Sequence, residues 1–107
     1  MATSKNWEAK IIPSISGDKH TLYVKGEINT GGIHMQASLI KRFPQGINST
    51  ILLLDAKPIS EDSDTFVQVS YSEELKKDSP QYSTIEIYKS QSDLLLHTIE
   101  HIDRVMS

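Results

Sequence analysis

Cysteine is absent from the 107-residue chain. Its absence excludes a disulfide framework, a metal site built from thiolates and a catalytic cysteine. A domain of this length buries roughly 65% of the surface that its unfolded chain exposes, so one hydrophobic core can hold it without covalent links. We therefore expect a single domain over residues 1–107.

Long apolar segments and clustered positive charge are also missing. No segment approaches the ~20 apolar residues that cross a bilayer, and the stretch from Met1 to Trp7 lacks the apolar region of a signal peptide. The formal net charge is −3 and the basic residues are scattered, whereas nucleic-acid binding needs a concentrated basic face. We expect a soluble cytoplasmic protein that binds neither nucleic acid nor membrane.

What the sequence does contain is alternation of apolar and polar residues. Alternation places successive side chains on opposite faces of a β-strand. It recurs in five segments bounded by turn-forming residues: 7–11, 20–28, 33–39, 66–71 and 82–88. A sixth predicted strand, 51–57, begins instead with an unbroken apolar run. Gly26 falls on an apolar face, where it either leaves room for a neighbour or marks a β-bulge. The longest apolar run, Ile51–Leu54, predicts a strand buried on both faces.

The predicted core collects the inward-facing residues of these strands. Its members are Trp7, Ala9, Ile11, Leu22, Val24, Ile28, Met35, Ala37, Leu39, Leu52, Leu54, Val67, Val69, Ile85, Ile87 and Leu96. About seven short strands in about one hundred residues fit an antiparallel two-sheet sandwich of the immunoglobulin-like kind. The predicted fold class is therefore all-β.

The segment 94–106 is compatible with two structures. Leu95, Ile99 and Ile102 follow helical spacing, which favours an amphipathic helix. A strand would instead complete the sandwich begun by the six preceding segments. We favour the strand, and the alternative is an α+β protein with a C-terminal helix at 94–106.

Residues around the start of the 82–88 segment resemble the tyrosine corner of fibronectin type III domains. The resemblance is carried by Leu75, Pro80, Tyr82, Ile85 and Ile87. In such a corner, a tyrosine near the start of the sixth strand donates its hydroxyl proton to the backbone a few residues upstream. The resemblance implies a sandwich architecture, and an architecture alone assigns no function.

The segment 43–50 is the first candidate binding surface. Its composition is that of a connecting loop, yet it carries the apolar residues Phe43 and Ile47 on either side of Gln45. Loops hold binding residues more often than strands do. We expect both apolar side chains to be tucked under the loop and to contact a partner from there.

The second candidate surface is the polar face of the 33–39 strand, which carries His34 and Gln36. No complete catalytic constellation is present, so the leading hypothesis is a non-enzymatic binding or protein-interaction module whose partner is unknown. Self-association is a further possibility, because an exposed edge strand can pair with its own copy. A small-ligand carrier is an alternative if the strands close into a barrel.

His97, Glu100 and His101 form the sharpest chemical motif. Together they match the H-x-x-E-H pattern, and in these residues alone the chain resembles the inverzincin metallopeptidases. On a helix, histidines four residues apart lie about 6 Å from one another and can bind one zinc ion. On a strand they lie roughly 13 Å apart, too far to share a metal. A metal-dependent hydrolase is therefore an alternative that requires a helix, and we otherwise expect no enzyme and no cofactor.

Overall fold

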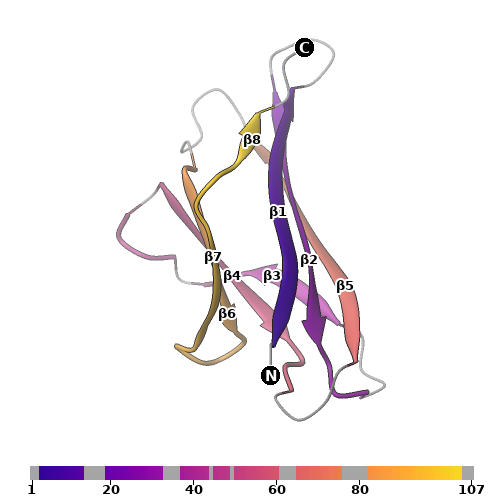
Figure 1. The fold of residues 1–107 in the computed structure, drawn as a ribbon. Coiled ribbons are helices and arrows are strands. Elements are labelled where there is room, and N and C mark those ends of the chain that lie inside the picture. Colours follow the sequence, from indigo (N-terminus) through magenta and orange to yellow (C-terminus); the bar gives the residue numbers. More distant parts are fainter. Residues whose placement is uncertain are drawn as a thin grey trace.

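The computed structural model describes residues 3–13, 19–32, 37–43, 45–48, 50–60, 65–75 and 82–104. These residues form eight β-strands and no helix (Figure 1). The strands are β1 Ser4–Pro13, β2 His20–Asn29, β3 Ser38–Lys41, β4 Ile51–Lys57, β5 Phe66–Leu75, β6 Thr84–Lys89, β7 Leu95–Ile99 and β8 Asp103–Arg104. The favoured prediction for the last segment is confirmed, and the alternative with a helix at 94–106 is wrong for its described part.

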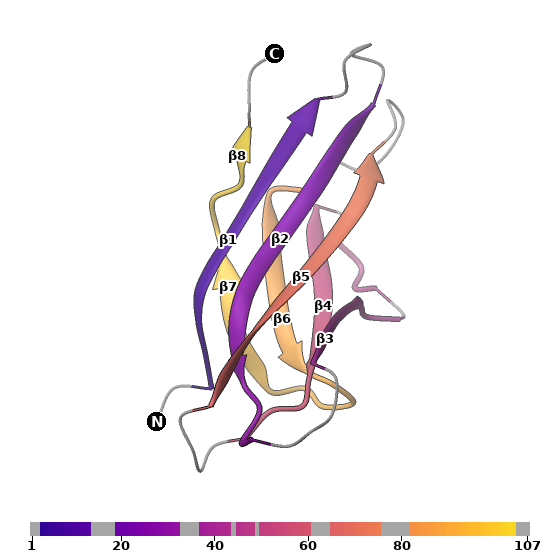
Figure 2. The same cartoon turned by 90° about the vertical axis from the view of Figure 1, so that its right-hand side faces the viewer.

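The strands are arranged in two facing sheets (Figures 1 and 2). The first sheet has the order β5-β2-β1-β8 and the second has the order β3-β4-β6-β7. Apolar residues fill the space between them, as the alternating pattern requires. The predicted all-β two-sheet sandwich is therefore confirmed.

Strand direction is more varied than the antiparallel pairing that we expected. Four pairs are antiparallel, but β4 pairs with β6 in parallel, and so does β1 with β8. Between β4 and β6 the chain crosses to the first sheet and runs back along β5. That single reversal lets β6 start at the same end as β4, which makes the two strands parallel.

The core between the sheets follows the alternation closely. Eleven residues predicted to be inside are buried: Ala9, Ile11, Leu22, Val24, Ile28, Leu39, Leu52, Leu54, Val69, Ile85 and Ile87. Trp7, Ala37 and Leu96 are partly buried against them, and Met35 lies outside the described residues. Among the described residues, four further apolar side chains that were not in the predicted set are buried: Ala56, Leu75, Tyr82 and Ile99.

Val67 is the one predicted core residue that is exposed, with 39% of its surface accessible. It pairs with the buried Ile28 and so lies on the inner face of β5. The facing edge strand β3 is only four residues long. Its contact with β5, between Lys41 and Glu73, lies near the other end of that strand. The inner face of β5 therefore extends beyond the strand that could cover it.

The two faces of β4 differ, although we expected both to be buried. Leu52, Leu54 and Ala56 point inward and are inaccessible to solvent. Of the outward residues of the strand, Ile51, Leu53 and Asp55 are half-buried and Lys57 is exposed. Among the described residues, this face of β4 is covered by Arg42 and by the loop that follows β3.

Trp7 closes one flank of the sandwich through a β-bulge in β1. The register between β1 and β2 shifts between Lys5 and Glu8, and Asn6 has a φ of 58°. This places Trp7 against Gly26, where an added Cβ would lie 2.2 Å from Cε3 of the indole. The indole also stacks on His97 of β7, with 6.3 Å between ring centroids. Gly26 thus leaves room for a neighbour, as its position on the apolar face predicts.

Candidate functional site

The candidate site begins where β3 ends, on the outer face of the second sheet. Alternation along β3 turns Lys41 toward the first sheet and Arg42 toward the outside. The Arg42 Nε donates to Asp55 Oδ1 at 2.8 Å, and both side chains are largely buried. The guanidinium lies 4.3 Å from the ring centroid of Tyr88, a distance typical of a cation–π contact.

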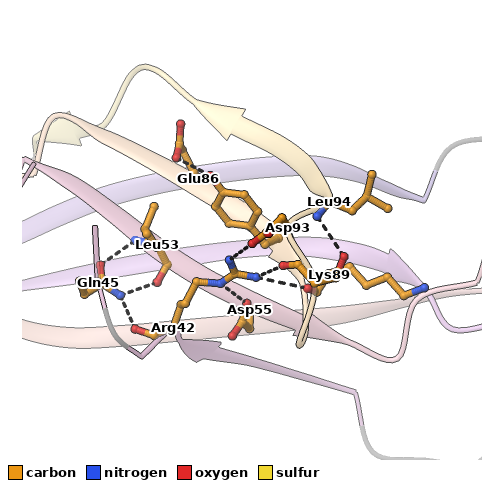
Figure 3. A network of polar contacts seen from close by, with 10 residues as sticks. Arg42, Gln45, Leu53, Asp55, Glu86, Lys89, Asp93 and Leu94 are labelled. Carbon is orange, nitrogen blue, oxygen red and sulfur yellow. Dashed lines mark hydrogen bonds and ion pairs between the residues drawn. The ribbon is translucent and has the colours of Figure 1, made fainter. Parts of the chain in front are cut away.

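Arg42 also reaches the turn between β6 and β7 (Figure 3). Its Nη2 donates to the carbonyl oxygens of Lys89 and Ser92, and its Nη1 lies 3.6 Å from the Asp93 carboxylate. One side chain therefore connects β3, β4, β6 and this turn. An arginine suits the role because its planar group carries five donors in fixed directions.

Gln45 fixes the loop that follows β3, here called the apolar loop (residues 43 and 45–48). Its Nε2 donates to the carbonyl oxygens of Arg42 at 2.6 Å and Leu53 at 2.9 Å. The Leu53 N–H donates back to Oε1 of the same amide at 2.9 Å. The side chain thus takes the place of a neighbouring strand beside β4, as Figure 3 shows. We call Arg42, Gln45 and Asp55 the loop clamp.

The far end of the apolar loop is also hydrogen-bonded. The Asn48 side-chain oxygen accepts bonds from Thr50 N at 3.0 Å and Thr50 Oγ1 at 2.7 Å. The Ile51 N–H donates to the Asn48 carbonyl oxygen at 3.2 Å. Side-chain bonds of this kind hold a turn without apolar packing.

Phe43 and Ile47 project from this loop into solvent. Phe43 is 94% exposed and Ile47 is 107% exposed, so the expectation that they are tucked under the loop is wrong. The physical reason is that Gln45 and Asn48 hold the backbone with polar bonds, which leaves the apolar side chains without a structural role. Two large apolar groups fully exposed on one loop are unusual for a protein that has no partner.

A hollow of about 480 Å³ adjoins Phe43. It lies between the apolar loop and the β6–β7 turn, and its lining residues are Arg42, Phe43, Gln45, Gly46, Leu53, Asp55, Gln91, Ser92 and Asp93. It is open to solvent, and so is a surface depression rather than an enclosed pocket. Asp93 presents a fully exposed carboxylate at the rim, so the site combines apolar surface with an accessible negative charge.

The structure thus brings three of the predicted site residues, Phe43, Gln45 and Ile47, together on one loop. The other two, His34 and Gln36, lie outside the described residues. Arg42 and Asp55 were not among the predicted residues. Their only signal in the sequence is that each lies on the outward face of an alternating strand, where a charge is ordinary.

A second polar group, here called the flank cluster (Lys41, Tyr71, Glu73 and Tyr82), lies between the sheets. The Glu73 carboxylate accepts hydroxyl bonds from Tyr71 at 2.6 Å and from Tyr82 at 2.9 Å. Lys41 Nζ lies 3.2 Å from Oε1 of the same carboxylate. Tyr82 is buried just before the sixth strand, as in a tyrosine corner, but its hydroxyl bonds to a side chain of the other sheet rather than to nearby backbone.

Ionisation in the flank cluster favours a fixed charge state. Burial alone would raise the pKa of Glu73, but the bonds from Tyr71, Tyr82 and Lys41 outweigh it and hold the pKa below its ordinary value of 4.5. Burial, followed by the bond to Glu73, raises the pKa of both tyrosines above 10.0. At neutral pH the cluster is one carboxylate held by two hydroxyls and an ammonium, which joins the sheets.

The two histidines of the H-x-x-E-H motif lie in different surroundings. His97 lies in β7 and its ring stacks on Trp7. His101 lies beyond the end of that strand, with Nε2 2.8 Å from Asp103 Oδ1. Within the described ranges, no three histidine or acidic side chains come close enough to hold a metal ion. Residues 95–99 form a strand, so the described part of 94–106 does not supply the helix that the motif requires.

Comparison with protein-family models, with curated proteins and with solved structures finds no match to this chain. The site therefore has to be interpreted from its own geometry. The described strands form two separate layers with edges and do not close into a barrel. Among the described residues there is no helix of the length and apolarity needed to cross a membrane.

Proposed function

We propose that this protein is a non-enzymatic interaction module that binds a protein partner through its apolar loop. The observation that carries the proposal is the full exposure of Phe43 and Ile47 on a loop that polar bonds hold in place. A cysteine-free chain needs no oxidising compartment, so the proposal keeps the expected cytoplasmic location.

Exposed apolar side chains on a fixed loop are suited to binding for an energetic reason. A few buried apolar or aromatic anchors supply most of the free energy at protein interfaces. Ordering a flexible loop on binding would offset part of that gain. Here the amide of Gln45 already holds the loop against Leu53, so that cost is small. The adjoining hollow offers space for a partner side chain next to Phe43.

The test uses a phage-displayed library of random peptides as the probe. Peptides are selected on the wild-type protein, and their affinities are measured by calorimetry against the double variant Phe43→Ser, Ile47→Ser. The expected loss is about tenfold or more, because interface anchors of this size contribute more than about 1 kcal/mol each. Circular dichroism should show an unchanged fold.

The matched control is Tyr23→Ser, which removes a half-exposed aromatic ring from the outer face of the first sheet. Its affinity for the selected peptides should equal that of the wild type. The proposal is wrong if the double variant binds the peptides as tightly as the wild type. It is also wrong if no peptide is enriched on the wild type over the double variant.

A further inference from the structure

Of the described strands, four lie at the edge of a sheet, and three of these are protected against pairing with another chain. An unprotected edge presents a row of free backbone donors and acceptors. β3 has four residues, and the Gln45 amide occupies the adjoining part of β4. β8 has two residues. β7 has five residues and an irregular register with β6.

β5 lacks each of these protections. It has ten residues and pairs with β2 along its whole length without a register shift. It contains no proline and no lysine, the residues that most often block an edge. Its inward charge, Glu73, is compensated by Lys41 and two hydroxyl groups. Figure 1 shows β5 at the margin of its sheet, beside β2, and no described strand of that sheet lies beyond it.

We propose that β5 pairs antiparallel with β5 of a second copy of this chain, so that two first sheets join into one. The charges along the strand favour this partner and this direction. At one end of β5 the outward-facing Glu74 is half-exposed and pairs with the exposed Lys19. At the other end the Lys5 ammonium lies 4.1 Å from the ring centroid of Phe66, on the same outward face. Antiparallel pairing brings Glu74 of each copy toward Phe66 and Lys5 of the other, whereas parallel pairing would place the two Glu74 carboxylates opposite one another, which is unfavourable.

The outer face of β5 is also compatible with a close approach. Its central outward residues, Gln68, Ser70 and Ser72, are short or unbranched, polar and exposed. A two-fold axis through the middle of the strand gives each copy the same contacts. This surface is separate from the apolar loop, which lies on the outer face of the other sheet. The dimer therefore does not depend on the proposed function, and it would present two apolar loops.

The absence of native cysteine makes a cross-linking test direct. Single variants Gln68→Cys, Ser70→Cys and Ser72→Cys are oxidised alone and in pairwise mixtures, with Ser83→Cys as an exposed control outside β5. Opposite residues of antiparallel strands have Cα atoms about 4.5–5.5 Å apart, within disulfide range. We expect one β5 combination to form linked dimers about tenfold faster than Ser83→Cys, which reacts only on collision.

Sedimentation equilibrium and hydrogen exchange on the unmodified chain complete the test. We expect a dimer that dissociates on dilution, with amides in 66–75 exchanging more slowly in the dimer than in the monomer. The variant Phe43→Ser, Ile47→Ser should dimerise as the wild type does. Three results would each overturn the proposal: a monomer at every concentration, a dimer lost in that loop variant, or cross-linking no faster at β5 than at Ser83.

Discussion

Lys41 and Arg42 are neighbours in the chain, yet they serve two different parts of the molecule. Lys41 points inward to the flank cluster, where it meets the carboxylate of Glu73. Arg42 points outward to the loop clamp, where it meets the carboxylate of Asp55. The alternation of a strand separates them by the thickness of a sheet. Of these two adjacent basic residues, Lys41 thus helps to join the two sheets, and Arg42 helps to hold the apolar loop at the surface.

The flank cluster and the loop clamp differ in the groups that their polar side chains bind. In the flank cluster, the bonds converge on the Glu73 carboxylate from side chains of both sheets. In the loop clamp, Arg42 and Gln45 bond largely to backbone carbonyl oxygens near the surface. Loss of the flank cluster should lower the free energy of unfolding of the whole domain, because the cluster joins the two sheets. Loss of the loop clamp should release the apolar loop and leave the sheets packed together.

The largest effect is expected for Glu73→Ala. Removal of the carboxylate leaves the hydroxyls of Tyr71 and Tyr82 without their acceptor and Lys41 without its counter-ion. An unsatisfied buried polar group costs about 1–3 kcal/mol, so a loss of about 3 kcal/mol in the free energy of unfolding is expected. Urea denaturation followed by circular dichroism measures it.

Glu74→Ala is the matched control, because Glu74 is the next residue on β5 and points to the other face. Its side chain is 52% exposed and pairs with Lys19, which is also exposed. Exposed pairs contribute about 0–1 kcal/mol. Equal losses in the two variants would show that the flank cluster does not join the sheets.

A loss of about 2 kcal/mol is expected for Arg42→Ala, which removes the partner of the largely buried Asp55 and several loop bonds. The more informative change is local. Amides of residues 45–48 should exchange faster with solvent than in the wild type, while those of 71–75 should change no more than the global loss of stability requires. Faster exchange at both sites beyond that loss would mean that the two networks act as one.

A smaller effect is expected when pH alone is changed. The folded protein holds the pKa of Glu73 below 4.5, so the carboxylate stabilises the fold fully above that pH. This contribution is lost as pH falls through the lowered value, because the unfolded chain then takes up the proton first. The difference in unfolding free energy between the wild type and Glu73→Gln should therefore shrink on acidification. A difference that stays constant from neutral pH to well below 4.5 would contradict the assigned bonds.

At alkaline pH, the two tyrosines of the flank cluster should lower the stability of the fold as pH rises. The folded protein raises the pKa of Tyr71 and Tyr82 above 10.0. Their contribution to the free energy of unfolding is therefore complete below pH 10.0 and is lost as pH rises through their raised pKa values. Tyr88, whose pKa is raised first by its bond to Glu86 and then by burial, lies outside the flank cluster. Tyr88→Phe should therefore leave the Glu73-dependent part of the profile in place.

Sequence periodicity predicts the interior of this fold well, because burial on one face is a local property of a strand. Leu22, Leu54 and Ile87 are inside for that reason. Periodicity carries no information on which strands become neighbours, so the parallel pairing of β4 with β6 was not predicted. For the same reason, periodicity could not decide between a strand and a helix at 94–106, because the strand β7 forms through its pairing with β6.

The candidate site was predicted in part and for an incomplete reason. Phe43 and Ile47 are distinctive in a loop, but an apolar residue in a loop suggests burial until the bonds of Gln45 are known. The flank cluster could not be predicted, because Lys41, Glu73 and Tyr82 meet only where two particular edges face each other. Contacts of that kind depend on topology rather than on local sequence.

The stacking of the Trp7 indole between Gly26 and His97 has a practical consequence for spectroscopy. Trp7 is the single tryptophan of the chain, so its emission reports on one flank, where β1 meets β7. The flank cluster lies on the opposite side and holds two of the four tyrosines of the chain. With Tyr23 and Tyr88 replaced by phenylalanine, tyrosine absorbance would report on that flank, and its unfolding curve will coincide with that of tryptophan emission only if the sandwich opens on both sides at once.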